Sequence, residues 1–276
     1  MIKDVVVALA VGRPRDVAAE YAVSLAAASD AHVTGIAFAY EPVIPGTVMT
    51  GYPYDFLDAQ RAENRTAADA AAARLTEAAR RAGVASESRT CEATVIGAAD
   101  LFGRMARRFD LAVVAQGDPE SQTGQERFIE AALFQSGRPV IVVPFIQSTG
   151  AAFDRVLLGW DGSQTAARAI GDALPLLARA KEVEIVIVAT DHVKRDHITG
   201  TGLARHLAHH DLRVEVKTLT PGDLDVANTI LSYAADSSAD FIVMGGYGHS
   251  RLREFVLGGA TRAILQSMTV PVLMAH

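Results

Sequence analysis

The sequence predicts an α/β protein with two tandem domains, each built around a doubly wound, parallel sheet of five strands. Short apolar runs rich in Val and Ile alternate with longer segments whose apolar residues recur at helical spacing. This alternation is typical of strand–helix–strand units, which form parallel sheets covered by helices on both faces. The same succession occurs twice, and a chain of 276 residues, half of them hydrophobic, is long enough for two domains.

Four predicted strands of the first half have counterparts in the second half. The matched pairs are Val5–Ala10 with Val156–Trp160, His32–Ala39 with Val183–Ala189, Asp110–Ala115 with Asp240–Gly245, and Arg138–Pro144 with Thr269–Met274. The polar, Gly-containing segment Gln147–Ala152 separates the halves. We therefore expect domains at residues 1–146 and 153–276, each with a ligand crevice at the carboxyl ends of its strands.

Helices are expected between these strands. An Ala-rich segment follows the first strand as far as Ala28, and a second helix is predicted from about Thr165 to Ala180. The first half also contains an insertion. Its part at Tyr40–Tyr54 is rich in turn formers and aromatic residues, and it is either a surface loop or a lid over a pocket or partner. Alanine content and a stop at Gly83 then predict one long helix over Asp55–Ala82.

Composition excludes several classes of protein. A net charge of −6 argues against binding of duplex nucleic acid, which requires clustered Lys and Arg. The one cysteine, Cys91, cannot form an intrachain disulfide and indicates a reducing compartment. The apolar run at Met1–Val11 is too short for a membrane span, and Gly12–Arg15 does not resemble a signal-peptide cleavage site. We expect a cytoplasmic protein without a membrane anchor.

A glycine-rich loop in the second half is the main functional motif. It lies between a predicted strand, Ala239–Met244, and a predicted helix, Ala260–Met268. Unpaired backbone N–H groups at a helix N-terminus bind anions, and glycine permits the close approach that such binding needs. We interpret Gly245, Gly248, Gly258 and Gly259 as a phosphate-binding loop. On the four glycines alone, a tight turn without a ligand is an equal alternative.

Other nucleotide motifs are absent from the sequence. A P-loop requires Gly-x4-Gly-Lys-Ser/Thr, and no such run occurs. The dinucleotide fingerprint Gly-x-Gly-x-x-Gly also fails, because Arg251 stands at the position of its third glycine. These absences weaken the hypothesis of an enzyme.

The loop spacing Gly-x2-Gly-x9-Gly resembles the nucleotide loop of the universal stress protein family. The resemblance implies an adenine nucleotide alpha hydrolase-like, Rossmann-like fold and binding of ATP or a related adenine nucleotide, with or without Mg²⁺. It implies that the protein acts in the stress response by changing its conformation or its association when a ligand binds, and not by catalysing a reaction. The chain departs from the family pattern at Gly259, where a hydroxyl residue is expected, and Thr261 matches a second hydroxyl position.

The resemblance also implies which residues would contact the nucleotide. Asp161, in the loop Gly159–Ser163, would contact the base or ribose, while Ser163 caps the following helix. The backbone of Ala189 would meet adenine, and Met244 and Tyr247 would line the base and ribose. The full predicted set is Gly159, Trp160, Asp161, Ala189, Met244, Gly245, Tyr247, Gly248, His249, Arg251, Gly258, Gly259, Ala260 and Thr261. No catalytic residue and no metal ligand is predicted.

The first half lacks this pattern at both loops. Its first loop, Ala10–Arg15, has no Asp-Gly-Ser, and its later loop, Ala115–Gly124, places Asp118 and Glu120 where phosphate would be repelled. We expect it to have lost ATP binding and to serve as a scaffold, dimer partner or site for another ligand. The resemblance implies a pseudo-dimer in which Val140–Val143 pairs with Val272–Met274, and further association of two chains.

Several alternatives stay open at this point. A slow Mg²⁺-dependent ATP hydrolase would use Asp161 or His249, and a nucleotide-free interaction module is favoured by Gly259. Arg251 and Arg253 either bind phosphate or pair with neighbours such as Glu254. Cys91 is expected to be a packing residue. His206, His209 and His210, with His192 and His197 nearby, have a spacing that permits metal binding, but an exposed polar face is the favoured interpretation.

Overall fold

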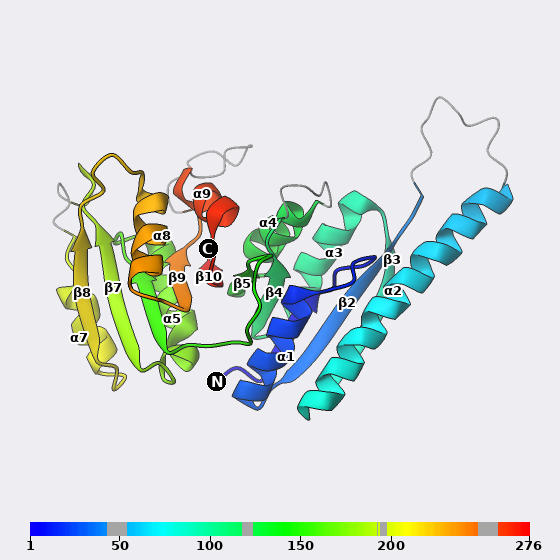
Figure 1. The fold of residues 1–276 in the computed structure, drawn as a ribbon, viewed down its shortest axis with the longest axis horizontal. Coiled ribbons are helices and arrows are strands. Elements are labelled where there is room, and N and C mark those ends of the chain that lie inside the picture. The colour runs from blue at the N-terminus through cyan, green and yellow to red at the C-terminus, as the bar shows by residue number, and fades with distance from the viewer. Residues whose placement is uncertain (43–53, 118–123, 192, 194–197, 248–258) are drawn as a thin grey trace. The chain divides into compact units, whose positions relative to one another are not determined.

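Strands and helices alternate along both halves of the chain in the computed structural model (Figure 1). The structure describes residues 1–42, 54–117, 124–191, 193, 198–247 and 259–276. Contacts divide the chain into two units. One comprises Ile2–Ala115 with Gln122–Arg138, and the other comprises Met1, Gln116–Ser121 and Pro139–His276.

The N-terminal unit is a parallel sheet with the strand order β3-β2-β1-β4. Helices α1 and α2 cover one face of this sheet, and α3 and α4 cover the other (Figure 1). Its strands are β1 (Asp4–Ala8), β2 (His32–Tyr40), β3 (Ser86–Ala93) and β4 (Leu111–Ala115), and its helices are α1 (Val17–Ser29), α2 (Tyr54–Ala82), α3 (Val95–Ala106) and α4 (Gln125–Gln135).

The C-terminal unit has the strand order β5-β10-β9-β6-β7-β8. All its pairs are parallel except β5 with β10, which is antiparallel. Helices α5 and α7 cover one face, and α8 and α9 cover the other (Figure 1). Its strands are β5 (Val140–Val143), β6 (Arg155–Gly159), β7 (Glu182–Val188), β8 (Val214–Leu219), β9 (Phe241–Gly245) and β10 (Val272–Ala275), and its helices are α5 (Gln164–Leu177), α7 (Thr201–Ala208), α8 (Val226–Asp236) and α9 (Gly259–Ser267).

The last strand of the first half, β5, pairs with the last strand of the second half, β10, as expected. Val272 lies opposite Val142, Leu273 opposite Ile141, and Met274 opposite Val140. All six side chains are fully buried. The predicted pairing of Val140–Val143 with Val272–Met274 is confirmed, and β5 thereby belongs to the sheet of the C-terminal unit.

Local sequence signals explain where the helices begin and end. Four helices start with a side chain that accepts a hydrogen bond from the first turn: Asp16 for α1, Thr94 for α3, Ser163 for α5 and Asp225 for α8. The predicted long helix is α2, and Gly83 follows it with φ of 68°, a left-handed conformation that glycine adopts without strain.

The fold class is confirmed, while some elements were not identified from the sequence. The strands β3 and β8 escaped notice because they are half-exposed and carry alternating charged residues in place of an apolar run. Within the described ranges, no helix has the length and apolar content needed to cross a bilayer. Most of the insertion at Tyr40–Tyr54 lies outside the described residues.

Candidate functional site

The C-terminal unit has a topological switch point between β6 and β9. From β6 the chain proceeds to β7 and β8 on one side, and from β9 it proceeds to β10 on the other. In open parallel sheets, ligands bind in the crevice outside the carboxyl ends of the strands at such a point. Leu158 in β6 lies opposite Val243 in β9, so the loops that follow both strands leave the sheet side by side.

The loop after β6 is held by its own side chains. An Asp161 carboxylate oxygen accepts a hydrogen bond from the Ser163 N–H at 2.9 Å, and Gly162 between them has φ of 77°. The Ser163 hydroxyl accepts from the Ala166 N–H at 3.1 Å and caps α5. The predicted cap at Ser163 is confirmed. Recognition of a base or ribose by Asp161 stays a prediction.

Gly245, the last residue of β9, lies against the first turn of α5. A Cβ atom at this position would be 2.5 Å from the Ala166 nitrogen and 2.6 Å from the Thr165 hydroxyl oxygen. Contacts that short are not possible, so glycine is required for α5 to approach the end of β9. This packing brings the loops after β6 and β9 together.

The two ends of the glycine-rich loop are joined by a hydrogen bond. The Tyr247 N–H donates to the Thr261 hydroxyl oxygen at 3.2 Å, and both residues are buried. Tyr247 has φ of 59°, which turns the chain away from the strand. Thr261 was predicted to contact phosphate, and the structure shows that its oxygen accepts a bond from the loop backbone. Its hydroxyl hydrogen can still be donated to a ligand.

The N-terminus of α9 lies beside the end of β9, where Tyr247 is hydrogen-bonded to Thr261. The helix starts at Gly259, which is exposed, and a Cβ atom there would meet no described residue within 4 Å. The first backbone N–H groups of a helix have no partner within it and carry partial positive charge. Gly259 and Ala260 therefore begin a helix at the position predicted for phosphate.

The remaining predicted residues lie around the same strand ends. The Ala189 N–H donates to the Leu219 carbonyl at 2.8 Å, so its own carbonyl is the group that a base could contact. Trp160 donates its backbone N–H to Val186 at 2.9 Å. Met244 is buried, and its Cβ would be 3.4 Å from a Cβ built at Gly159.

A mainly apolar hollow of about 560 Å³ opens beside Trp160, between α5 and α7. Ile170, Ile198, Leu203 and His206 contribute to its lining. His206, His209 and His210 were expected to lie on one helix. This helix is α7, which ends at Ala208, so of the three only His206 is helical. His206, His209 and His210 are exposed, and the His206 and His210 rings lie 4.9 Å apart. In the part of the chain that the structure describes, no group of His, Cys, Asp or Glu is arranged to hold a metal.

Five predicted residues of the loop lie outside the described residues. They are Gly248, His249, Arg251, Arg253 and Gly258. His192 and His197 in the second half, and Asp118 and Glu120 in the first, lie outside them too. Their roles stay predictions.

Gln116, which was not identified from the sequence, binds carbonyl groups at the C-terminal end of α9. Its buried side-chain amide donates to the Leu265 carbonyl at 2.8 Å and to the Gln266 carbonyl at 3.3 Å. Its side-chain oxygen accepts from the Phe145 N–H at 3.2 Å. The last carbonyls of a helix need such partners. The sequence contains no signal for this contact, because 149 positions separate Gln116 from Leu265.

In the N-terminal unit, the loop after β1 is the counterpart of the loop after β6. An acidic side chain, Asp16, holds this loop. The Asp16 carboxylate accepts from the Ala10 N–H at 2.6 Å and from the Ala19 N–H at 3.0 Å. Burial raises the pKa of this carboxyl group, and the two backbone hydrogen bonds oppose that rise. Asp16 caps α1 as Ser163 caps α5, and the loss of the nucleotide site in the first half stays a prediction.

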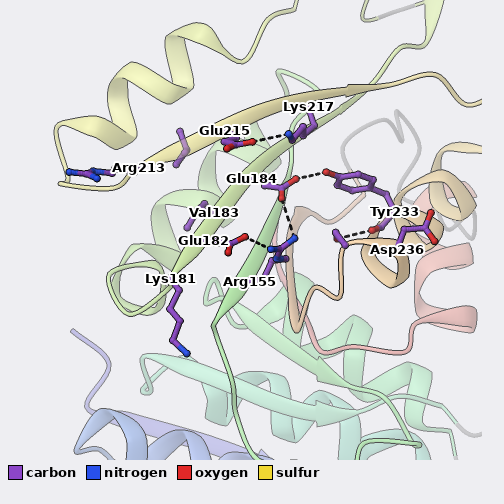
Figure 2. Close-up of a pocket in the computed structure, with 12 residues that line it drawn as sticks. Arg155, Lys181, Glu182, Val183, Glu184, Arg213, Glu215, Lys217, Tyr233 and Asp236 are labelled. Atoms are coloured by element: carbon purple, nitrogen blue, oxygen red, sulfur yellow. Dashed lines mark hydrogen bonds and ion pairs between the residues drawn. The ribbon is translucent and has the colours of Figure 1, made fainter.

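A second hollow, of about 610 Å³, lies at the amino ends of β6 and β7 (Figure 2). Arg155 forms ion pairs with Glu182 and Glu184, and Tyr233 donates its hydroxyl to Glu184. Burial, and after it the bond to Glu184, raises the pKa of Tyr233. The charged groups lining this hollow are largely paired with one another, so it offers little net charge to a ligand.

The model of the universal stress protein family matches residues 152–276. The second half of the chain belongs to this family. The universal stress protein Slr1230 of Synechocystis is 29% identical over 175 residues, which cover 61% of this chain and 55% of that protein. This chain thus spans about half the length of that relative. The universal stress protein YxiE of Bacillus subtilis is 26% identical over 151 residues, covering 45% of this chain and 99% of the relative.

Similarity to solved structures extends over both halves. A universal stress protein of Archaeoglobus fulgidus aligns over 99% of this chain and 97% of its own, with a TM-score of 0.70 and 15% identity. At that identity the match demonstrates the fold of the whole chain and nothing further. The chain therefore has the universal stress protein fold throughout, and its second half has the family's sequence pattern as well.

Proposed function

We propose that the second half of this chain binds ATP or a related adenine nucleotide at the crevice between β6 and β9. One observation carries the proposal. At the switch point, the hydrogen bond between Tyr247 and Thr261 closes the base of the glycine-rich loop, and α9 begins beside it at Gly259, where a Cβ atom would meet no described residue within 4 Å. A nucleotide phosphate, with or without Mg²⁺, is the anion that family membership of this half favours.

The residues around the crevice then take separate roles. The N–H groups of Gly259 and Ala260, with the Thr261 hydroxyl, bind phosphate, together with the loop glycines Gly248 and Gly258. The Ala189 carbonyl accepts from the adenine amino group, and Asp161 contacts base or ribose while its other bond keeps the loop turned. Met244 and Tyr247 line the base and ribose side. Nucleotide binding changes conformation or association, and no residue is assigned to catalysis.

The test is isothermal titration with ATP, AMP and buffer, using variants at Gly259. Because a Cβ atom at this position meets no described residue within 4 Å, we expect the fold to tolerate substitution. Gly259→Asp places a carboxylate at the start of α9, where it repels phosphate. We expect ATP affinity to fall at least about tenfold, which is about 1.4 kcal/mol. Gly259→Asn has nearly the same shape without the charge, and its affinity for ATP should stay much closer to that of wild type.

Two results would overturn the proposal. One is the absence of binding heat with wild-type protein at millimolar ATP, which would favour the nucleotide-free interaction module. The other is equal loss of affinity in Gly259→Asp and Gly259→Asn, since charge would then not be the cause. Release of ADP from the same samples tests the hydrolase alternative, and turnover that disappears in His249→Ala would establish it.

We further propose that the protein acts in the cytoplasm and that two chains associate. The compartment follows from Cys91, which has no second cysteine in the chain with which to form a disulfide. Association fits the family expectation, and the structure contains a surface suited to it.

A further inference from the structure

The strand β8 forms the outer edge of the C-terminal sheet. It is the last strand in the order of the described strands and pairs on one side with β7. Along its other side, the N–H and C=O groups of alternate residues point away from the sheet. Val216, at its middle, has 41% of its surface exposed. An exposed apolar residue on an open edge strand marks a place where another strand can add.

Two oppositely charged residues, Glu215 and Lys217, precede and follow Val216 in the sequence. Glu215 and Lys217 are two positions apart, so both side chains lie on the same face, opposite to that of Val216. Their charged atoms form an ion pair at 2.8 Å (Figure 2). Both side chains are well exposed, Lys217 by 42% and Glu215 by 72%. They are therefore available to a second strand.

The edge strand of the N-terminal unit repeats this charge pattern. In β3, Glu87 and Arg89 occupy the second and fourth positions, as Glu215 and Lys217 do in β8, and they pair at 2.8 Å. The two strands differ in how they are covered. Helix α2 contacts β3 through bonds from Thr76 to Ser88 and from Thr90 to Asp69. Strand β8 has the exposed Val216 instead, and so is the better candidate for pairing.

We propose that β8 pairs in antiparallel orientation with the β8 of a second copy of this chain, across a two-fold axis at Val216. In this register Val216 faces its own counterpart, and Glu215 faces the partner's Lys217. Each of the four charges then has an opposite charge beside it on its own strand and another across from it. The two Val216 side chains cover each other, which removes an exposed apolar residue from water.

Neighbouring registers are excluded by like charges. An axis at Glu215 places two glutamates opposite each other and sets Lys217 against Arg213. An axis at Lys217 places two lysines opposite each other. An axis between residues sets the charged face of one strand against the apolar face of the other. Of these axes, only the one at Val216 gives complementary charge and complementary polarity together, because like charges directly opposite destabilise a strand pair. An axis at Val214 would set the residues of β8 against residues that precede the strand.

The first experiment uses complementary charge variants. Glu215→Lys gives four positive charges at the pair, and Lys217→Glu gives four negative charges. We expect each variant alone to dimerise at least about tenfold more weakly than wild type in sedimentation velocity at low salt, without nucleotide. An equimolar mixture of the two variants places lysines opposite glutamates and should restore dimers. Circular dichroism of each variant monitors its fold, and recovery in the mixture excludes misfolding as the cause of the loss.

The second experiment tests the register with single cysteines in a Cys91→Ser background. Val216→Cys lies opposite itself and should form a covalent dimer with oxidant or a short thiol-to-thiol reagent. Thr218→Cys lies opposite residue 214 of the partner and should react at least about tenfold more slowly, since the two substituted positions are then four residues apart along the strand, about 13 Å. Thr218 is exposed, so its accessibility matches that of Val216.

The inference stands apart from nucleotide binding, because both experiments are done without ligand. Wild-type protein that stays monomeric at about 0.5 mM would overturn it. Dimers that persist in Glu215→Lys alone, or equal cross-linking at residues 216 and 218, would also overturn it, and would indicate another surface such as β3.

Discussion

At the level of single residues, the two described glycines that flank the candidate loop meet different physical needs. Gly245 is required because a Cβ atom would collide with the backbone of α5. A Cβ atom at Gly259 would meet no described residue within 4 Å, and the role proposed for this glycine is at the helix N-terminus, where backbone N–H groups bind anions. Both glycines belong to the predicted phosphate-binding loop, and only the structure separates the packing role of Gly245 from the proposed binding role of Gly259.

Asp16 provides a residue-level prediction of pH dependence. Asp16→Ala removes the acceptor for the Ala10 and Ala19 N–H groups and should lower the free energy of unfolding by about 1–2 kcal/mol. Burial raises the pKa of the folded carboxyl group above its ordinary value of 3.8. The folded state thus holds this proton more tightly than the unfolded state does, and the stability that Asp16 contributes falls as pH rises through the raised pKa.

Urea unfolding of wild type and Asp16→Ala at pH 3.5 and pH 7 measures this effect. The difference in unfolding free energy between the two proteins should be larger at pH 3.5. A larger difference at pH 7 would mean that the two backbone hydrogen bonds outweigh the effect of burial on this carboxylate.

Residue roles were predictable from sequence where they depend on neighbours along the chain. The cap at Ser163 was predicted correctly, because capping requires a hydroxyl just before a helix. The bond between Tyr247 and Thr261 was not predicted, since it depends on how a loop returns to its strand. Asp16 was missed as a loop acceptor for a similar reason, as its bond to Ala10 depends on backbone geometry.

At the level of elements, α9 is fixed at both ends by residues from elsewhere in the chain. Thr261, in its first turn, is bonded to Tyr247 after β9, and the carbonyls near its C-terminus accept from Gln116 after β4. The helix has no basic residue in its last turn to serve that purpose. Gln116 therefore helps to position the helix whose N-terminus forms the proposed phosphate site.

Substitution of Gln116 should loosen α9. Gln116→Met has similar length but cannot donate to the Leu265 carbonyl or accept from the Phe145 N–H. Leaving buried polar groups unpaired should lower the free energy of unfolding by about 1–3 kcal/mol. Gln116→Glu should be at least as destabilising, because it adds negative charge at the C-terminal end of the helix.

Amide hydrogen exchange of α9 measures this loosening, with α5 of the same unit as the internal reference. Exchange should rise in α9 more than in α5 for both variants. If exchange in α9 does not change, the bonds from Gln116 do not hold the helix, and its place near the crevice depends on packing alone.

At the level of the whole molecule, β5 lies in the first half of the sequence but completes the sheet of the C-terminal unit. Ile141 in β5 is fully buried opposite Leu273 in β10. Ile141→Ala should cost about 2–5 kcal/mol of unfolding free energy. We expect amide exchange to rise in β10 and to change little in β1. Val6→Ala, at a fully buried position in β1, is the matched control and should show the opposite pattern.

An increase confined to β1 in the Ile141→Ala variant would contradict this assignment of β5. The overall architecture was predictable because buried parallel strands appear as continuous apolar runs. The division of the chain into units was less predictable. It depends on which sheet receives β5, and the apolar run at Val140–Val143 carries no information about its neighbour.

The pairing of β5 with β10 also has a consequence for how this chain behaves when dilute. The two strands are connected through one covalent chain, so their encounter does not depend on protein concentration. A short connection acts like a local concentration in the millimolar range. The same contact made between two separate proteins would depend on their concentration. Joining the two strands in one polypeptide therefore makes this pair independent of the number of copies that a cell contains.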